Sequence, residues 1–196
     1  MTSLEAALRQ IHGDLTEIRL SFALVGGLAV SARTEPRFTR DADLAVAVAT
    51  DAEAEALIHE LRARDYRIEA IVEQEAVGRL ATARLTPSTA LRTPVIDLLF
   101  ASSGIEAEVV AEAESIELLP TLTMGVARTG HLIALKVLSR DDIRRPQDLV
   151  DLRALLRVAS RDELQRARDA LALILDRGYH RGRDLVSEID SISDLG

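Results

Sequence analysis

Two aspartates, Asp41 and Asp43, lie one residue apart in a segment that continues directly into an apolar stretch, residues 44–48. On a β-strand this spacing places both carboxylates on the same face. Carboxylates this close repel each other unless a cation lies between them, and Mg²⁺ prefers carboxylate and phosphate oxygens. We therefore predict a site for Mg²⁺ or Mn²⁺ at the mouth of this strand. A solvated acidic loop is the simpler alternative.

A third acid, Asp97, lies inside an apolar run over residues 94–100. A carboxylate in such surroundings is costly unless it is paired, protonated or bound to a metal. A third carboxylate would complete a site in which two metal ions hold the attacking and leaving oxygens of a phosphoryl transfer. We predict that Asp97 contacts metal and is the general base on an acceptor hydroxyl, with a purely structural role as the alternative.

A glycine pair, Gly26 and Gly27, ends a short apolar segment and precedes a small-residue segment with helical character. Without side chains, the backbone can approach a triphosphate, and a helix N-terminus adds positive potential. Arg37 and Thr39 flank the aspartate pair closely enough to contact phosphate or to orient Asp41. These residues together predict a nucleotide site, although a glycine pair alone more often marks an ordinary turn.

Lys136 is the only lysine among 24 basic residues. A lysine ammonium is a compact point charge suited to a phosphate oxygen, whereas the arginine guanidinium is a planar fork. A leftover surface lysine is the plain alternative. Asp148 and Asp151 follow on a later predicted helix, one turn apart on one face. On spacing alone, a solvated acidic face near a helix N-terminus is the favoured interpretation of that pair. The four histidines show no metal-ligand spacing.

The hydrophobic pattern predicts an α+β fold, with a mixed sheet flanked by helices and followed by a C-terminal helical region. We expect helices over residues 3–19, 28–33, 52–64 and 105–113, and strands over 22–25, 44–48, 66–72, 79–85, 94–100, 115–119 and 122–127. The last two strands are expected at the edge of the sheet. Four further helices are expected over residues 131–140, 146–157, 162–175 and 181–192. Residues 1–127 would form the α/β catalytic region, and residues 128–196 the helical region packed on it.

The bulk composition of the 196 residues narrows the protein class. The absence of cysteine excludes disulfides and thiolate zinc sites. No run of 18 apolar residues and no signal-peptide pattern is present, so we expect a cytoplasmic protein with no membrane partner. The net charge of −8 argues against broad nonspecific binding of nucleic acid, although a local basic groove remains compatible with it.

Four motifs, in the same order along the chain, resemble the DNA polymerase beta-type nucleotidyltransferase superfamily. More narrowly, they are similar to the AbiEii-like nucleotidyltransferases of abortive-infection and toxin–antitoxin systems. The resemblance covers about residues 22–157. It rests on Gly26-Gly27, on Arg37-Phe-Thr39-Arg-Asp41-Ala-Asp43-Leu, on the lysine-bearing segment His131–Lys136, and on Arg145-Pro-Gln-Asp148-Leu-Val-Asp151-Leu.

The resemblance implies a division of roles among these residues. Asp41, Asp43 and Asp97 would bind magnesium, and Lys136 would contact the phosphates of a nucleoside triphosphate (NTP). Asp148 or Asp151 would steady Lys136 or the metal site. The protein would be the toxin of a toxin–antitoxin or abortive-infection system. The reaction would move a nucleoside monophosphate from the NTP to a hydroxyl of tRNA, of another RNA or of a protein, and release pyrophosphate. In related toxins the acceptor can be the 3′ end of tRNA, and a separate antitoxin protein neutralises the activity.

Two other functions are compatible with the same residues. The first is an antibiotic nucleotidyltransferase acting on an aminoglycoside or a lincosamide. An acidic cleft near Asp97 would favour a cationic aminoglycoside as acceptor, whereas an arginine-lined cleft would favour RNA. The second is a non-catalytic binding module. The set of Asp41, Asp43, Asp97 and Lys136 speaks against it, because binding alone does not require that combination.

Overall fold

The computed structural model describes residues 3–88, 94–141 and 143–193. The predicted catalytic and helical regions also take in residues 1–2, 89–93, 142 and 194–196, which lie outside the described residues. β7 ends at Val126 and α5 begins at Thr129. The predicted division at residues 127/128 therefore falls in the connection between the sheet and the helices.

A mixed seven-stranded sheet forms the centre of the described part of the chain, in the order β3-β4-β5-β2-β1-β7-β6. β1 is antiparallel to β2 and parallel to β7, while β2 is parallel to β5. The predicted α+β fold with a mixed sheet is thus confirmed. The strands are β1 (Phe22–Val25), β2 (Asp41–Val46), β3 (Tyr66–Gln74), β4 (Arg79–Pro87), β5 (Val95–Leu99), β6 (Glu114–Leu119) and β7 (Leu122–Val126).

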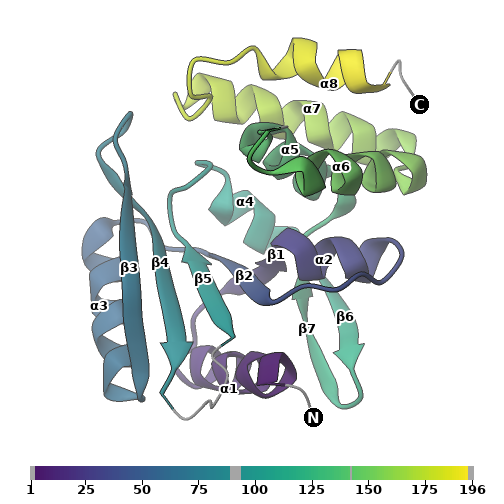
Figure 1. Cartoon of the computed structure of the whole chain (residues 1–196). Coiled ribbons are helices and arrows are strands. Elements are labelled where there is room, and N and C mark those ends of the chain that lie inside the picture. The colour runs from purple at the N-terminus through teal and green to yellow at the C-terminus, as the bar shows by residue number, and fades with distance from the viewer. Residues whose placement is uncertain (1–2, 89–93, 142, 194–196) are drawn as a thin grey trace.

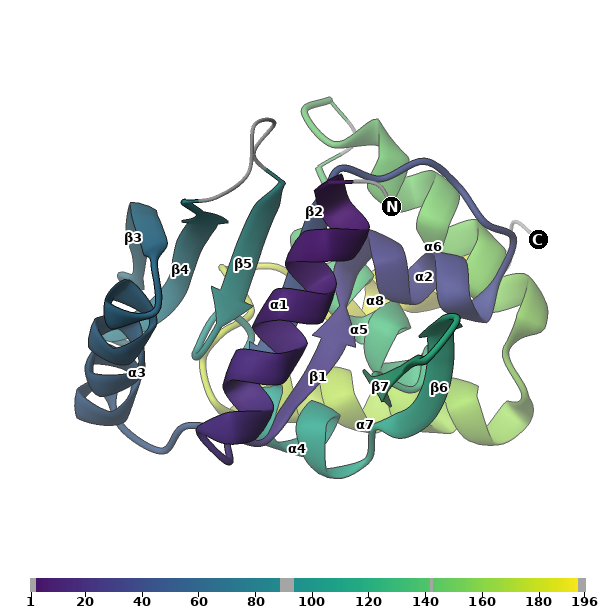
Figure 2. The same cartoon turned by 90° about the horizontal axis from the view of Figure 1, so that it is seen from below.

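Helices lie on two sides of this sheet. α5 to α8 gather above it in Figure 1, and Figure 2, seen from below, shows α1 lying across β1 and β2. α2 packs against β1 and β2 as well as against α5 and α6, so it joins the sheet to the helical region. The helices are α1 (Ser3–Glu17), α2 (Gly26–Arg33), α3 (Asp51–Ala63), α4 (Glu106–Ala111), α5 (Thr129–Ser139), α6 (Pro146–Val158), α7 (Arg161–Asp176) and α8 (Leu185–Ser193).

A single hydrophobic cluster runs from α1 to α8. The predicted inner face of α3 is confirmed, because Ala54, Leu57, Ile58 and Leu61 are all buried. The helical region shares this cluster with the sheet through Leu132, Ile133, Leu152 and similar side chains. Burial of one shared core explains why the two parts pack against each other without a flexible linker.

Three predicted elements differ from the structure in informative ways. β7 is not an edge strand: it lies between β1 and β6, and its alternating Leu122, Met124 and Val126 are buried. α8 begins at Leu185 rather than at residue 181, because Arg181 and Gly182 both have positive φ. The strand predicted over residues 44–48 begins at Asp41, so both aspartates lie within the ladder itself.

The register of the sheet places four residues in one row across four adjacent strands. Asp43 of β2 lies opposite Val25 of β1 on one side and Asp97 of β5 on the other. Asp97 in turn lies opposite Arg84 of β4. Because neighbouring residues in a ladder project to the same face, this row brings two carboxylates and a guanidinium together.

Among the described helices, none is long and apolar enough to cross a membrane.

Candidate active site

The three predicted acids lie at adjacent positions on β2 and β5. Asp43 and Asp97 are direct partners in the parallel ladder, and Asp41 precedes Asp43 by two residues on the same face. Asp41 is exposed, Asp43 is partly buried, and the Asp97 side chain is 12% exposed. The exposure of the three acids therefore decreases from Asp41 to Asp97, so a ligand would enter from the Asp41 side.

Asp43 carries the most perturbed carboxylate of the site. Burial raises the pKa of Asp43 to about 6, and the neighbouring charges of Asp97 and Asp41 add to the rise. The positive charges of Lys136 and Arg145 act in the opposite direction. A carboxylate with these neighbours is ionised at neutral pH at a cost that a bound cation would remove.

The glycine pair fits closely around these side chains. Gly26 has φ +64°, and a Cβ atom on it would lie 1.9 Å from Asp43 Oδ2. A Cβ atom on Gly27 would lie 2.7 Å from an Arg37 Nη atom and 3.2 Å from Thr39 Oγ1. Only glycine therefore fits at Gly26, whereas a side chain at Gly27 would displace the end of Arg37. The pair forms the first residues of α2, so backbone N–H groups at that N-terminus are available to an anion beside Asp43.

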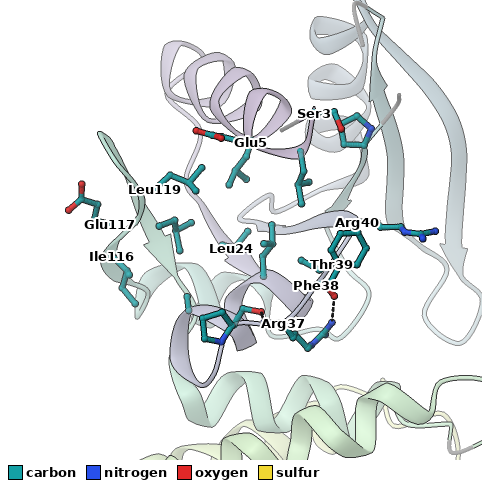
Figure 3. Close-up of a pocket in the computed structure, with 18 residues that line it drawn as sticks. Ser3, Glu5, Leu24, Arg37, Phe38, Thr39, Arg40, Ile116, Glu117 and Leu119 are labelled. Carbon is teal, nitrogen blue, oxygen red and sulfur yellow. Dashed lines mark hydrogen bonds between the residues drawn. The ribbon is translucent and has the colours of Figure 1, made fainter. Parts of the chain in front are cut away.

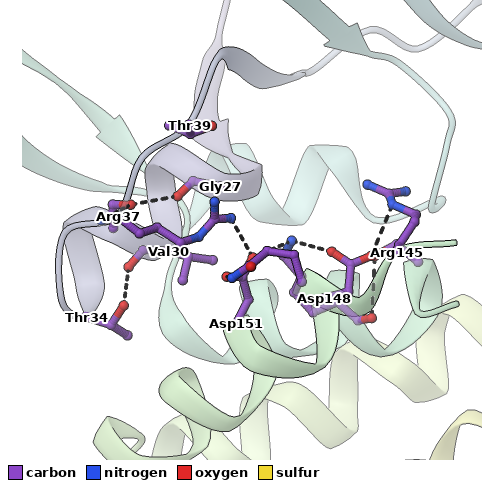
Figure 4. Close-up of polar contacts among 12 residues, drawn as sticks. Gly27, Val30, Thr34, Arg37, Thr39, Arg145, Asp148 and Asp151 are labelled. Carbon is purple, nitrogen blue, oxygen red and sulfur yellow. Dashed lines mark hydrogen bonds and ion pairs between the residues drawn. The ribbon is translucent and has the colours of Figure 1, made fainter. Parts of the chain in front are cut away.

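Lys136 lies in a buried ionic network between α5 and α6. Figure 4 shows Arg37, Arg145, Asp148 and Asp151 of this network. Its Nζ atom is 2.6 Å from Asp148 Oδ1 and 2.8 Å from Asp151 Oδ2. Asp151 also accepts a hydrogen bond of 2.7 Å from Arg37 Nη2, and Arg145 Nε lies 3.2 Å from Asp148 Oδ2. Two carboxylates of α6 thus bind three positively charged side chains, Lys136, Arg37 and Arg145, which come from three different segments.

The surface interpretations of these residues are wrong. Lys136 is 8% exposed, and Asp148 and Asp151 are 3% and 1% exposed. Both aspartates lie on the buried side of α6 together with Leu152 and Leu155. Burial alone would raise the pKa of Asp151, but hydrogen bonds from Lys136, Arg37 and Gln147 outweigh it and lower the pKa. Asp151 is therefore held as an anion inside the protein.

Arg37 and Thr39 project from the segment between α2 and β2 toward the glycine pair. The Arg37 guanidinium spans from Gly27 to Asp151, so it connects this segment to α6. Thr39 Oγ1 lies 3.4 Å from the carbonyl oxygen of Asp41. Thr39 is thus placed to orient the start of β2. Arg37 forms an ion pair with Asp151 of the buried network.

The donor set suits a hard divalent cation. Asp43 and Asp97 are partners in the ladder, and the missing side chain of Gly26 lets the Asp43 carboxylate lie against the start of α2. Within residues 3–88, 94–141 and 143–193, no three His, Asp or Glu side chains meet closely enough to enclose an ion by themselves. Mg²⁺ is commonly bound through one or two carboxylates, with water and substrate phosphates completing its shell, so Asp41, Asp43 and Asp97 would hold it only together with such further oxygens.

Arg84 is a site residue that the sequence analysis missed. Its guanidinium binds Asp97 through two hydrogen bonds, from Nε to Oδ1 at 2.8 Å and from Nη2 to Oδ2 at 2.7 Å. The signal was present as an arginine inside β4, between buried Ala83 and Leu85. Only the register of β4 against β5 reveals that this arginine lies opposite the lone aspartate of the next strand.

A separate cavity of about 830 Å³ is lined in part by the segment that carries Arg37 and Thr39 (Figure 3). Its lining comes from α1, α2, β6 and residues 36–40, and includes Leu4, Leu8, Leu24 and Leu28. None of Asp41, Asp43, Asp97 or Lys136 lines it. Its lining is largely apolar, and its two acids, Glu5 on α1 and Glu117 on β6, are not partners in one ladder as Asp43 and Asp97 are, so the carboxylate row is the better candidate for the active site.

A model of the family "Nucleotidyl transferase AbiEii toxin, Type IV TA system" matches residues 14–194. No curated protein matches the chain. Several solved structures share the fold. An antigenic nucleotidyltransferase-like protein from Paracoccidioides brasiliensis superimposes with a TM-score of 0.56 at 17% identity, covering 98% of this chain and 92% of that chain.

A second structure that shares the fold is that of ANT(2'')-Ia in complex with adenylyl-2''-tobramycin. It superimposes with a TM-score of 0.57 at 16% identity, covering 90% of this chain and 99% of that chain. The solution structure of the antibiotic-resistance factor ANT(2'')-Ia superimposes with a TM-score of 0.55 at 14% identity, and the match covers 96% of each chain. At these identities the likeness establishes a shared fold.

Proposed function

The chain belongs to the AbiEii nucleotidyltransferase toxin family and is a nucleotidyltransferase, and from this membership we propose that it moves a nucleoside monophosphate from an NTP to a hydroxyl of RNA in a reaction that depends on Mg²⁺ or Mn²⁺. The observation that carries the proposal is the ladder pair Asp43–Asp97, which lies beside Gly26 and within electrostatic reach of Lys136. The proposal is supported because the carboxylates could bind a metal ion, and the start of α2 and Lys136 could bind an anion beside them.

Each residue has a role in the proposed reaction. Asp41, Asp43 and Asp97 would hold the cation, which when bound neutralises phosphate charge and stabilises the leaving pyrophosphate. The N–H groups at the start of α2 and Lys136 would bind the triphosphate. Asp148 and Asp151 would act as positioning residues, because they fix the ammonium group of Lys136 at 2.6 and 2.8 Å.

Asp97 would also take the proton of the acceptor hydroxyl. The freed oxygen then forms a bond to the α-phosphorus while the bond from that phosphorus to pyrophosphate breaks. Two hydrogen bonds from Arg84 leave further lone pairs on the Asp97 oxygens, so the carboxylate can still accept this proton. Family membership also supports the proposal that a cognate antitoxin accompanies the protein.

The charge around the site supports RNA as the acceptor. Arg84 and Arg145 both act electrostatically on Asp43, and their side chains are 50% and 60% exposed. On the segment that leads into Asp41, Phe38 is 80% exposed and the Arg40 guanidinium lies 5.7 Å from its ring centroid; both residues also line the separate cavity. Arginines near an exposed aromatic ring are typical of surfaces that bind single-stranded RNA. They disfavour a polycationic aminoglycoside.

The antibiotic alternative is supported by the shared fold with ANT(2'')-Ia. One experiment compares the acceptors. The purified protein is incubated with each α-labelled NTP, Mg²⁺ or Mn²⁺, and either total RNA or an aminoglycoside. We expect label on an RNA band with at least one nucleotide and none with the Asp41→Ala/Asp43→Ala variant. Label on the aminoglycoside alone would favour the alternative.

A further inference from the structure

Arg84 occupies a position that no motif of the family resemblance includes. It lies at the end of the row formed by Val25, Asp43 and Asp97, on the strand next to Asp97 in the order shown in Figure 1. Half of its side chain is exposed, yet its guanidinium makes two parallel hydrogen bonds to the nearly buried Asp97. Two-point pairing of this kind fixes the plane of the carboxylate as well as its charge.

The geometry restricts what Asp97 can do. Both of its oxygens accept a hydrogen bond from Arg84, so a cation that approaches Asp97 must share those oxygens with a positively charged group. Arg84 lies opposite Asp97, which lies opposite Asp43, so its charge is next to the carboxylate set, and the charges of Asp41 and Asp43 help to raise the pKa of Arg84. A fixed positive charge this near a cation site opposes cation binding.

We propose that Arg84 is the positioning residue of Asp97 and the counter-ion of the carboxylate set before a cation binds, so that it orients the base and lowers the affinity of the nucleotide-free protein for a divalent cation. The inference rests on the proposed function. Its consequence is an order of binding, in which the cation enters with the negatively charged triphosphate rather than before it.

The two roles predict opposite effects of a single substitution. Arg84→Gln removes the positive charge, and we expect the dissociation constant for Mn²⁺ alone to fall about tenfold. The same variant loses the fixed orientation of Asp97, so kcat for nucleotide transfer should fall while KM for the nucleotide changes little. Arg84→Lys keeps the charge but cannot pair at two points, so Mn²⁺ affinity should stay near the wild-type value while kcat still falls.

The experiment is calorimetric titration of the full chain with Mn²⁺ in the absence of nucleotide, together with steady-state transfer kinetics. Arg67→Gln is the matched control, because Arg67 lies on the neighbouring strand β3 with its side chain 62% exposed, and the same unit of charge is removed away from the carboxylates. We expect Arg67→Gln to behave as wild type in both measurements.

Three results would overturn the inference. They are an Arg84→Gln protein that binds Mn²⁺ no more tightly than wild type, an unchanged kcat in that variant, or an Arg84→Lys variant with wild-type kcat. The lysine variant keeps the test decisive if Arg84→Gln does not fold. Failure of the wild type to bind Mn²⁺ even with NTP present would instead overturn the proposed metal-dependent function, and the inference with it.

Discussion

Asp43 is held where its charge destabilises the folded protein. Its partial burial and the nearby carboxylates of Asp97 and Asp41 raise its pKa to about 6. In the unfolded chain an aspartate titrates near its ordinary value of about 3.9. The folded state therefore binds more protons than the unfolded state between these values. The contribution of Asp43 to stability is greatest below about pH 4 and is lost as the pH rises through about 6.

We predict that Asp43→Asn stabilises the cation-free protein at pH 7.5, by about 2 kcal/mol, because the amide removes the ionised group. Urea unfolding at pH 7.5 and pH 4 measures the free energy of unfolding. The gain should shrink strongly at pH 4, where Asp43 is already protonated in the folded state. Asp51→Asn is the control: Arg79 lowers the pKa of Asp51, so its loss should not stabilise the protein. A variant that is less stable than wild type at pH 7.5 would contradict this account.

Lys136 neutralises two buried carboxylates, Asp148 and Asp151. We predict that Lys136→Ala lowers the free energy of unfolding by about 3 kcal/mol, since it leaves buried charge short of a partner. It should also weaken nucleotide use more than Arg140→Ala does, because Arg140 only follows the end of α5. Urea unfolding and KM for the nucleotide are the two measurements. Equal effects of both substitutions would mean that Lys136 has no special place in the site.

At the scale of elements, the start of α2 is fixed by the space that Asp43 occupies. We predict that Gly26→Ala abolishes transfer and destabilises the protein, because its Cβ would lie 1.9 Å from Asp43 Oδ2. Gly78→Ala is a matched control, since Gly78 has nearly the same φ of +62° but a Cβ atom on it would meet nothing within 4 Å. It should lose only about 1 kcal/mol, the cost of a left-handed backbone for alanine, and keep full transfer activity. Similar losses of activity in both variants would refute the steric argument.

The sequence was most informative where one element carried the whole signal. The Asp41–Asp43 spacing and the inner face of α3 both depend on local periodicity, and the structure places these side chains on the expected faces. Periodicity alone did not reveal that Asp148 and Asp151 are buried. Their burial depends on a lysine of another helix, and acids at a helix N-terminus are usually solvated.

Pairing between elements accounts for the other omissions. Arg84 was missed because its role depends on the register of β4 against β5, which no local pattern specifies. The interior position of β7 follows from its parallel pairing with β1, far away in sequence. Both facts arise from contacts that form only when the whole sheet assembles.

At the scale of the whole molecule, the candidate site lies where the sheet meets the helical region. β2 and β5 supply the carboxylates, while α5 and α6 supply Lys136 and the aspartates that hold it. α2 contacts both parts and begins with the glycine pair. The site is therefore a product of the complete fold, and a substitution that loosens α6 from α2 should impair the site without touching its carboxylates.

The measurement that tests the central claim most directly is single-turnover transfer of label from an α-labelled NTP to RNA, comparing wild type with Asp43→Asn after urea unfolding has shown that the variant is folded. We predict transfer by the wild type that depends on added Mg²⁺ or Mn²⁺, and a loss of at least about 100-fold in the variant. Transfer at the wild-type rate by the folded Asp43→Asn protein would show that the carboxylate row is not the active site.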